Sequence, residues 1–437
     1  MHRIRWFDPE SDDPATPVDW PVPALILATL FLNILFWEAH GLSLWPFRPL
    51  PLYLLLLGAV ALLVTALFFM GPSLATQAAR LPLLGVIENS FGSIPAFGLR
   101  LCCVLYLVLW IAYLIAVPVW LWSSQILRRQ VSSTESGIFA AAVLVFLFVT
   151  GSQSLRSGAK LALFTNKLGI AILVAALIRV HEGWPAVLDG FRISGERSWI
   201  SEVWRGLSEL TFYVAPLALL AANFGQRSPR RKQVAMTGLM GIALPLFGTL
   251  LIVDFIGAAT HASRFYQPSL SPSVAMALWG HAAGSGLPGR MMVAAITIFG
   301  AVRFGVRALA ETASIRTPAT RRGWVLLGCF VGAIAWAAVH PDTPTFTTAF
   351  DFSARCLAVT GAVLTVDFMV GRQRVERLRR IDWVGSIALL AGLATPMCVP
   401  HESMELLPSY LVGFLVCLCG RAVQKMPVAR QFEKARH

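Results

Sequence analysis

Residues 99–126 read LRLCCVLYLVLWIAYLIAVPVWLWSSQI, and after Arg100 this stretch contains no charged side chain. An α-helix rises about 1.5 Å per residue, so about 20 apolar residues cross the roughly 30 Å hydrocarbon layer of a bilayer. A helix that is apolar on every side is typical of a membrane span or a deep core. The stretch therefore predicts a transmembrane helix, and similar runs recur along the 437-residue chain.

The overall composition supports the same class. The chain is 56% apolar and only 14% charged, whereas soluble proteins carry about 25% charged residues. The net charge of +13 lies in short segments between apolar runs, a distribution that sets membrane topology and does not resemble a nucleic-acid-binding face. We therefore expect an all-α polytopic membrane protein that binds no nucleic acid.

Apolar runs separated by Pro and Gly predict about twelve transmembrane helices. The segments between them are too short for a folded soluble domain, so the function must reside inside the helical bundle. The expected helices are 21–40, 50–77, 99–126, 136–153, 160–180, 206–225, 234–259, 289–313, 323–340, 346–370, 383–400 and 406–424.

Basic residues in the connecting segments set the orientation of a polytopic chain. Segments after the even-numbered expected helices hold roughly twice as many Lys and Arg residues as segments after the odd-numbered ones. Arg421 adds to this count when it is grouped with the basic residues that follow it. We expect an integral protein of the cytoplasmic (inner) membrane with both termini on the cytoplasmic side.

Seven cysteines lie in apolar segments and form no Cys-x-x-Cys pattern. Such residues are more typical of buried packing than of disulfides or metal ligands. We therefore expect no metal site and no cofactor. The cysteines are Cys102, Cys103, Cys329, Cys356, Cys398, Cys417 and Cys419.

Three junctions between the expected helices carry motifs in a fixed order. These are ENSFGSIPA at 88–96, ANFGQR at 222–227 and VDFMV at 366–370. Together they resemble the nucleobase:cation symporter family, the cytosine/purine permeases, over roughly residues 60–380. The chain departs from the family pattern at Asn223, where the family usually has Asp, and at Asn89, where it often has Arg. Helix 21–40 also lacks the glycine-bearing break of the family.

The resemblance implies a leucine-transporter-type core with a five-plus-five inverted repeat and two further C-terminal helices. It also implies alternating-access uptake of a nucleobase or related small heterocycle, coupled to a cation or a proton. The expected organisation is a cytoplasmic tail at 1–20, a ten-helix transport core at 21–370, two additional helices at 371–424 and a basic tail at 425–437.

The helix expected at 99–126 carries the first candidate site residues. Tyr106, Trp110 and Tyr113 have the spacing i, i+4 and i+7, which places them on one helix face near the middle of the membrane. Aromatic faces hold a planar ring by stacking. In the family a tryptophan in this region stacks on the ligand, and Trp110 is the matching position; the family's Gln falls at Leu114. The alternative is an aromatic stripe that only packs.

Two further candidates lie in the expected helices 206–225 and 21–40. Tyr213 precedes Pro216 and stands ten residues before Asn223, near the position of the family's second stacking aromatic residue. An ordinary proline kink is the alternative. Asn33 lies deep in the first helix and is a candidate ligand contact, with a helix–helix hydrogen bond as the alternative.

The helix expected at 289–313 contains Arg303, Arg307 and Glu311 at intervals of four. A charge at membrane depth costs about 2.5–3.5 kcal/mol on insertion scales, so Arg303 should face a polar interior and is a candidate site residue. No Ser or Thr lies between Thr297 and Thr312 to supply sodium ligands. We therefore favour proton coupling over sodium coupling.

Alternative functions are an amino-acid or amine carrier on the same fold, a membrane-embedded enzyme, and a sensor derived from a transporter. An enzyme of this kind needs paired acids or a large external loop with a catalytic acid, and the sequence shows neither, so we expect no enzyme. Asp351 and Arg355, four residues apart, predict a local salt bridge. The expected partners are a small heterocycle, a coupling ion and membrane lipid.

Overall fold

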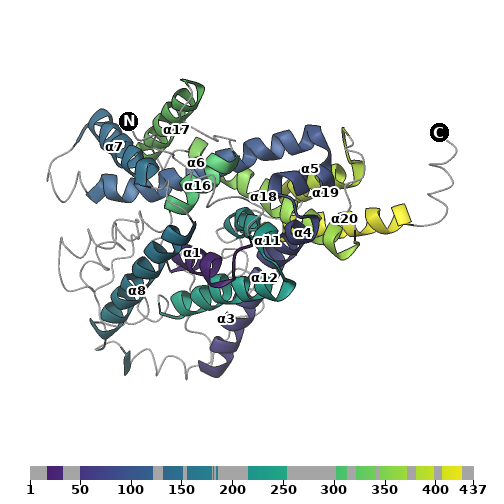
Figure 1. Ribbon diagram of the computed structural model, residues 1–437, viewed down its shortest axis with the longest axis horizontal. Coiled ribbons are helices and arrows are strands. Elements are labelled where there is room, and N and C mark those ends of the chain that lie inside the picture. The colour runs from purple at the N-terminus through teal and green to yellow at the C-terminus, as the bar shows by residue number, and fades with distance from the viewer. Residues whose placement is uncertain are drawn as a thin grey trace.

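The computed structural model describes twelve ranges of the chain, and within them the backbone forms helices and connecting turns without a β-strand (Figure 1). The described ranges are 17–32, 50–121, 131–150, 155–179, 181, 184–185, 215–252, 302–312, 321–340, 344–371, 380–397 and 406–425.

The helices of the first half follow the expected apolar runs, with one addition at 83–91. They are α1 Pro21–Phe31, α3 Leu50–Val64, η1 Thr65–Met70, α4 Gly71–Ala79, α5 Leu83–Phe91, α6 Ser93–Leu121, α7 Ser133–Thr150 and α8 Leu155–Arg179. Those of the second half are α11 Asn223–Arg227, α12 Arg231–Gly238, η4 Leu239–Ala243, α16 Arg303–Thr312, α17 Arg321–Val339, α18 Pro344–Met369, α19 Trp383–Ala394, η6 Thr395–Met397 and α20 Leu406–Lys425.

Five stretches of the described chain are long and apolar enough to cross a membrane, which confirms the polytopic all-α class. They coincide with five of the expected helices, although η1 and η4 interrupt two of them as short π-helical segments. These stretches are Leu57–Ala79, Ser93–Ala116, Arg231–Ile252, Pro344–Met369 and Leu406–Gln424.

The most enclosed of these spans is α18, and it organises the bundle. It packs against α6 and α4 and against the C-terminal helices α19 and α20 (Figure 1). The close approach of the C-terminal helices depends on glycine, because a Cβ at Gly392 or at Gly413 would lie 2.6 Å from a methyl group of Val359. Small residues let helix backbones approach in this way in membrane bundles.

The π-helical turn η1 leaves a carbonyl that the last helix satisfies. At its end Gly71 N–H donates to Ala66 O, five residues earlier. The same register assigns Leu67 O to position 72, but Pro72 has no N–H to donate. Tyr410 Oη of α20 donates to Leu67 O at 3.1 Å instead. The backbone hydrogen bonding of the spanning stretch Leu57–Ala79 is therefore completed by a side chain 343 positions later in the chain.

The short helix α5 was not expected, because nine residues are too few to span a membrane. Its buried residues recur at helical spacing, as at Leu83, Val86 and Ile87. The Leu83 N–H at its start donates to Asn223 Oδ1 at 2.7 Å. At its end Gly92 has φ 87°, and a Cβ there would lie 2.7 Å from Arg380 O, so only glycine fits this turn into α6.

Arg421 does not belong to the exposed basic tail with which we grouped it. Its side chain is 1% exposed and lies in a network that we call the C-terminal junction, formed by Arg421, Asp367, Asp382 and Ser90. Its Nε donates to Asp367 Oδ1 at 2.7 Å and its Nη1 to Asp382 Oδ1 at 2.9 Å. Its Nη2 donates to Ser90 O and Asp367 Oδ2, both at 3.3 Å. The junction joins α20 to α18, to the start of α19 and to the end of α5.

The cysteines fit the packing interpretation only in part. Cys103, Cys356 and Cys417 are buried, as expected, whereas Cys329 and Cys419 are exposed on the protein surface. An apolar helix in a membrane protein also presents side chains outward, which the apolar context of a single residue does not reveal. Cys398 lies outside the described residues.

Candidate functional site

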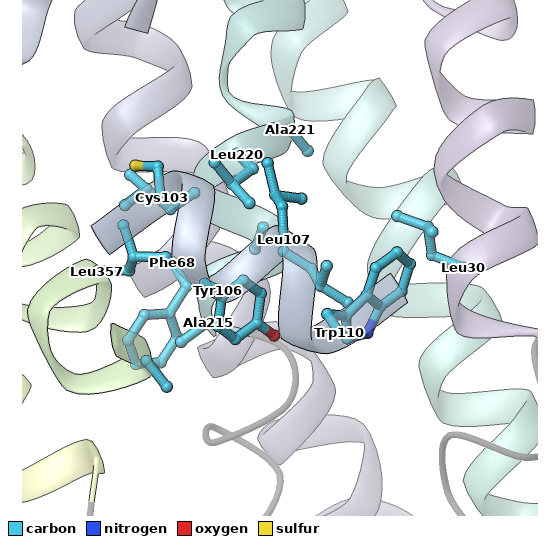
Figure 2. Packing of buried hydrophobic residues seen from close by; sticks show 14 of the residues in the cluster. Leu30, Phe68, Cys103, Tyr106, Leu107, Trp110, Ala215, Leu220, Ala221 and Leu357 are labelled. Atoms are coloured by element: carbon cyan, nitrogen blue, oxygen red, sulfur yellow. The ribbon is translucent and has the colours of Figure 1, made fainter. Parts of the chain in front are cut away.

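Helix α6 carries two large polar-tipped aromatic residues into the centre of the apolar core. Tyr106 is 0% exposed and Trp110 is 1% exposed, and we call these two residues the aromatic pair. They lie on successive turns of α6 with Leu107 between them (Figure 2). Tyr113, the third residue of the predicted face, is only half-buried. The predicted face of α6 is therefore buried at Tyr106 and Trp110 and partly open at Tyr113.

The ring of Tyr106 is held by α18. It stacks on Phe350 with ring centroids 5.0 Å apart and an interplanar angle of 20°, and Phe350 stacks in turn on Phe346. One face of the tyrosine ring is therefore occupied by protein. Its hydroxyl is buried and has no hydrogen-bond partner within the described part of the chain.

The indole of Trp110 is held by α16. A Cβ placed on Gly305 would lie 2.8 Å from Trp110 Cζ3 and 2.9 Å from Ile111 Cγ1, so the absence of a side chain lets α16 contact α6 here. In an indole the Cζ3 corner lies across the ring from the nitrogen. The Nε1–H therefore points away from α16, and it too is buried without an acceptor among the described residues.

The two groups belong to a larger set of buried polar atoms that have no hydrogen-bond partner among the described residues, Trp184 Nε1 and Thr249 Oγ1 included. Each buried donor without an acceptor costs about 1–3 kcal/mol relative to a satisfied one. Phe or Leu would fill the same space without this cost. In the view of Figure 2 the Tyr106 hydroxyl and the Trp110 nitrogen both lie on the edge of the cluster away from Leu220 and Ala221. The aromatic pair therefore stays a candidate for ligand contact, and packing within the core is the alternative.

Arg303 begins α16, the helix that contacts Trp110, and its side chain is half-buried. Arg307 follows one turn later and is also half-buried. The side chain of Glu311, its predicted partner, lies outside the described residues. Leu114, where the family has Gln, is fully buried.

The remaining candidates divide into two groups. Asn33 and Tyr213 lie outside the described residues, so they stay predictions. Asn223, where the family has Asp, accepts a hydrogen bond from the start of α5, and a neutral amide oxygen is sufficient for that task. The predicted Asp351–Arg355 salt bridge is present, with Arg355 Nε 2.8 Å from Asp351 Oδ2.

Sequence reasoning missed Phe350, Gly305 and the C-terminal junction as parts of this architecture. Phe346 and Phe350 are four residues apart, a spacing that places both on one helix face. That signal identified neither their partner helix nor Tyr106, which is more than 200 positions earlier in the chain. Asp367 stood in a quoted motif, but its partner Arg421 was assigned to the tail.

No protein-family model and no curated protein sequence matches the chain. Solved structures do match its fold. Mhp1 in an inward-facing conformation has a TM-score of 0.62 and is 14% identical, covering 95% of this chain and 93% of that one. Mhp1 in a closed conformation with bromovinylhydantoin bound, described as a nucleobase-cation-symport-1 family transporter, has a TM-score of 0.62 and 14% identity over 97% and 96%.

A Na⁺-coupled sialic acid symporter in a substrate-bound outward-open state has a TM-score of 0.62 and is 10% identical, over 93% of this chain and 89% of that one. At such identities the similarity establishes the fold. The chain is an all-α integral membrane protein with the leucine-transporter-type architecture that its motifs implied.

Proposed function

We propose that the protein is a secondary active transporter that takes up a nucleobase or a related small heterocycle by alternating access. Its fold is shared by symporters of small molecules, one of which binds a substituted hydantoin. A planar heterocycle suits a site walled by aromatic side chains, because aromatic rings stack favourably at offset or edge geometries.

The aromatic pair is the observation that carries this proposal. Tyr106 contacts α18 and Trp110 contacts α16, and the polar tips of both residues are enclosed. The fold alone does not determine which ligand is bound, since the sialic acid symporter has the same fold. The choice of a ring-shaped substrate rests on Tyr106 and Trp110, and Arg303 on the neighbouring helix adds a positive charge to the same region.

We further propose that transport is driven by protons and does not require sodium. Sodium needs several oxygen ligands, and the segment between Thr297 and Thr312 contains no hydroxyl side chain. A guanidinium at Arg303 supplies a fixed positive charge in that segment. Uptake into proteoliposomes should therefore change less than twofold when sodium replaces potassium, and a tenfold stimulation by sodium would contradict the proposal.

A thermal-shift panel on detergent-purified protein tests the substrate class. Nucleobases, hydantoins, allantoin and amino acids are each added with and without sodium. A ligand at a hundred times its dissociation constant stabilises the folded state by about 2.7 kcal/mol. We expect at least one heterocycle to shift the melting temperature and Trp110→Ala to abolish the shift.

Trp383→Ala is the matched control, because Trp383 is an exposed tryptophan at the start of α19. This variant should retain the full ligand-induced shift. If no heterocycle changes the melting temperature and an amino acid raises it, the proposed substrate class is wrong, although the fold is unaffected.

A further inference from the structure

Four exposed basic residues from two distant segments of the chain gather where two spanning stretches end. Arg80 follows α4, and Arg230, Arg231 and Lys232 stand at the start of α12. The segments meet because α4 packs against α11 and α12 (Figure 1). Arg80 takes part in this contact, since its Nη1 donates to Ser228 O at 3.2 Å. We call the four exposed basic residues the basic surface.

The contact between the two segments is close and hydrogen-bonded, which fixes the positions of the basic residues. Thr76 Oγ1 of α4 donates to Ala222 O at 2.7 Å. A side chain at Gly225 would overlap Ser73 O, so the two backbones approach directly. A ligand that binds groups already held in place loses less free energy to ordering them.

Little negative charge lies near the basic surface in the described part of the chain. Neither 50–87 nor 215–252 contains an Asp or Glu residue, and the next acid is Glu88 of α5. Asp19 also reaches this region, where it accepts a hydrogen bond from Gln233 Nε2 at 3.2 Å. Even when both carboxylates are counted against the four cations, the surface keeps a net positive charge.

The ends of the spans place the basic surface at the level of the lipid headgroups. The span Leu57–Ala79 ends directly before Arg80, and the span Arg231–Ile252 begins within the basic surface. Trp20 precedes α1, which packs against α12, and tryptophan is enriched at membrane–water interfaces. The phosphates of the surrounding lipid are therefore the anions closest to these side chains.

We infer that the basic surface binds the headgroup of an anionic phospholipid, such as phosphatidylglycerol or cardiolipin. Clusters of four or more Lys and Arg residues beside a spanning helix attract anionic lipids, and guanidinium groups donate to phosphate oxygens in pairs. The guanidinium of Arg231 lies 5.6 Å from the centre of the Phe368 ring, near the end of α18. A bound headgroup thus bridges α4 and α12 beside α18 and stabilises their contact. This lipid site is separate from the aromatic pair.

The first experiment compares lipids by their effect on thermal unfolding. The full-length protein in a neutral detergent is heated with added phosphatidylcholine, phosphatidylglycerol or cardiolipin. We expect the two anionic lipids to raise the melting temperature by several degrees and phosphatidylcholine to leave it unchanged. Glycerol phosphate at the same phosphate concentration distinguishes a lipid from a soluble anion. An equal rise with glycerol phosphate, or no rise with either anionic lipid, would overturn the proposal.

The second experiment removes charge without disturbing the contact between the segments. Arg230→Gln with Lys232→Gln leaves the hydrogen bonds of Arg80 in place and should at least halve the rise caused by cardiolipin. Lys160→Gln with Lys167→Gln is the matched control, because it removes two exposed cations from α8. The control should keep the full rise. Equal losses in the two double variants would show a general attraction to positive charge and contradict a site at the basic surface.

An acidic segment of the chain itself is the competing occupant of the basic surface. Residues 8–13 contain four carboxylates, and the described chain begins a few positions later at residue 17. If the full-length protein ignores anionic lipid and a variant without residues 2–14 responds to it, the lipid proposal is wrong for the intact protein. If both respond to the same extent, the headgroup is the occupant.

Discussion

The C-terminal junction and the aromatic pair are both fully enclosed and both polar, yet they differ in how completely their groups are paired. Arg421 donates to two carboxylates, a backbone carbonyl and Gln424 Oε1. Asp382 also caps α19 by accepting from Gly385 N at 3.0 Å. Tyr106 Oη and Trp110 Nε1 have no partner in the part of the chain that the structure describes.

The difference in hydrogen bonding distinguishes a cluster that stabilises the fold from one that is a candidate for binding. A network whose donors and acceptors all pair within the protein holds helices together, and a ligand adds no hydrogen bond to it. Buried groups that lack partners cost stability in the empty protein, and a ligand that supplies the partners recovers that cost. The C-terminal junction is thus a polar cluster that serves the fold, whereas the aromatic pair is the cluster for which we propose a role in binding.

The largest effect is expected at the junction. Arg421→Ala leaves Asp367 and Asp382 buried together without their cation, and breaking a buried ion pair in this way costs about 3–5 kcal/mol. Denaturation in detergent should show a loss of this size or a failure to purify folded protein. Arg380→Ala removes an exposed cation from the same region and should change stability by less than about 0.5 kcal/mol.

If Arg421→Ala had the stability of the wild type, the junction would not serve the fold as we describe. The double variant Asp367→Asn with Arg421→Met is a second test of whether the C-terminal junction stabilises the fold. It removes the cation and one carboxylate together, so it should be more stable than Arg421→Ala alone.

Substitution at Gly305 tests the role of Trp110, because α16 contacts the indole ring at this glycine. A methyl group at this position would lie 2.8 Å from the Trp110 ring, so Gly305→Ala must displace the indole. Overpacking of this kind costs about 1–3 kcal/mol, and ligand affinity should fall further because the N–H is redirected. Gly328→Ala on α17 is the control, since a Cβ there meets nothing within 4 Å. Equal ligand affinity in both variants would contradict the assignment of Trp110 to the site.

Tyr410→Phe should have a smaller effect on stability. It leaves Leu67 O without a donor, at a typical cost of about 1 kcal/mol for one hydrogen bond. Hydrogen exchange at the amides of η1 should increase in this variant, because the π-helical turn loses its tie to α20. Unchanged protection of η1 would show that another group takes over the carbonyl.

The smallest effect is expected at Asp351. The Asp351 side chain is 32% exposed and that of Arg355 is 12% exposed, so water reaches the carboxylate, and ion pairs with such access contribute up to about 1 kcal/mol. Asp351→Asn retains an acceptor for Arg355, so the thermal midpoint should fall by no more than a few degrees. A loss as large as that of Arg421→Ala would show that Arg355 depends on its partner as a buried cation does.

The sequence predicted the spanning helices well because long uniform apolar runs report helix length directly, as for α6, α18 and α20. It missed α5 because nine residues resemble a connecting segment. It also misassigned Arg421, since the run of basic residues after it suggests an exposed tail and the contacts with Asp367 and Asp382 exist only in three dimensions. Helical spacing found Tyr106 and Trp110, but Phe350 and Gly305 approach them from distant segments that no local pattern connects.

The tie between Tyr410 and Leu67 also has a consequence for synthesis of the chain. The two residues are 343 positions apart, and a ribosome that adds about 5–20 residues per second needs roughly 20–70 seconds to cover that distance. During this interval the carbonyl at Leu67 lacks its donor, whereas Asp367 is made only 54 positions before Arg421 and lacks its cation for about 3–11 seconds. Chains stopped before α20 lack both contacts, so we expect quality-control proteases to recognise them as unfinished.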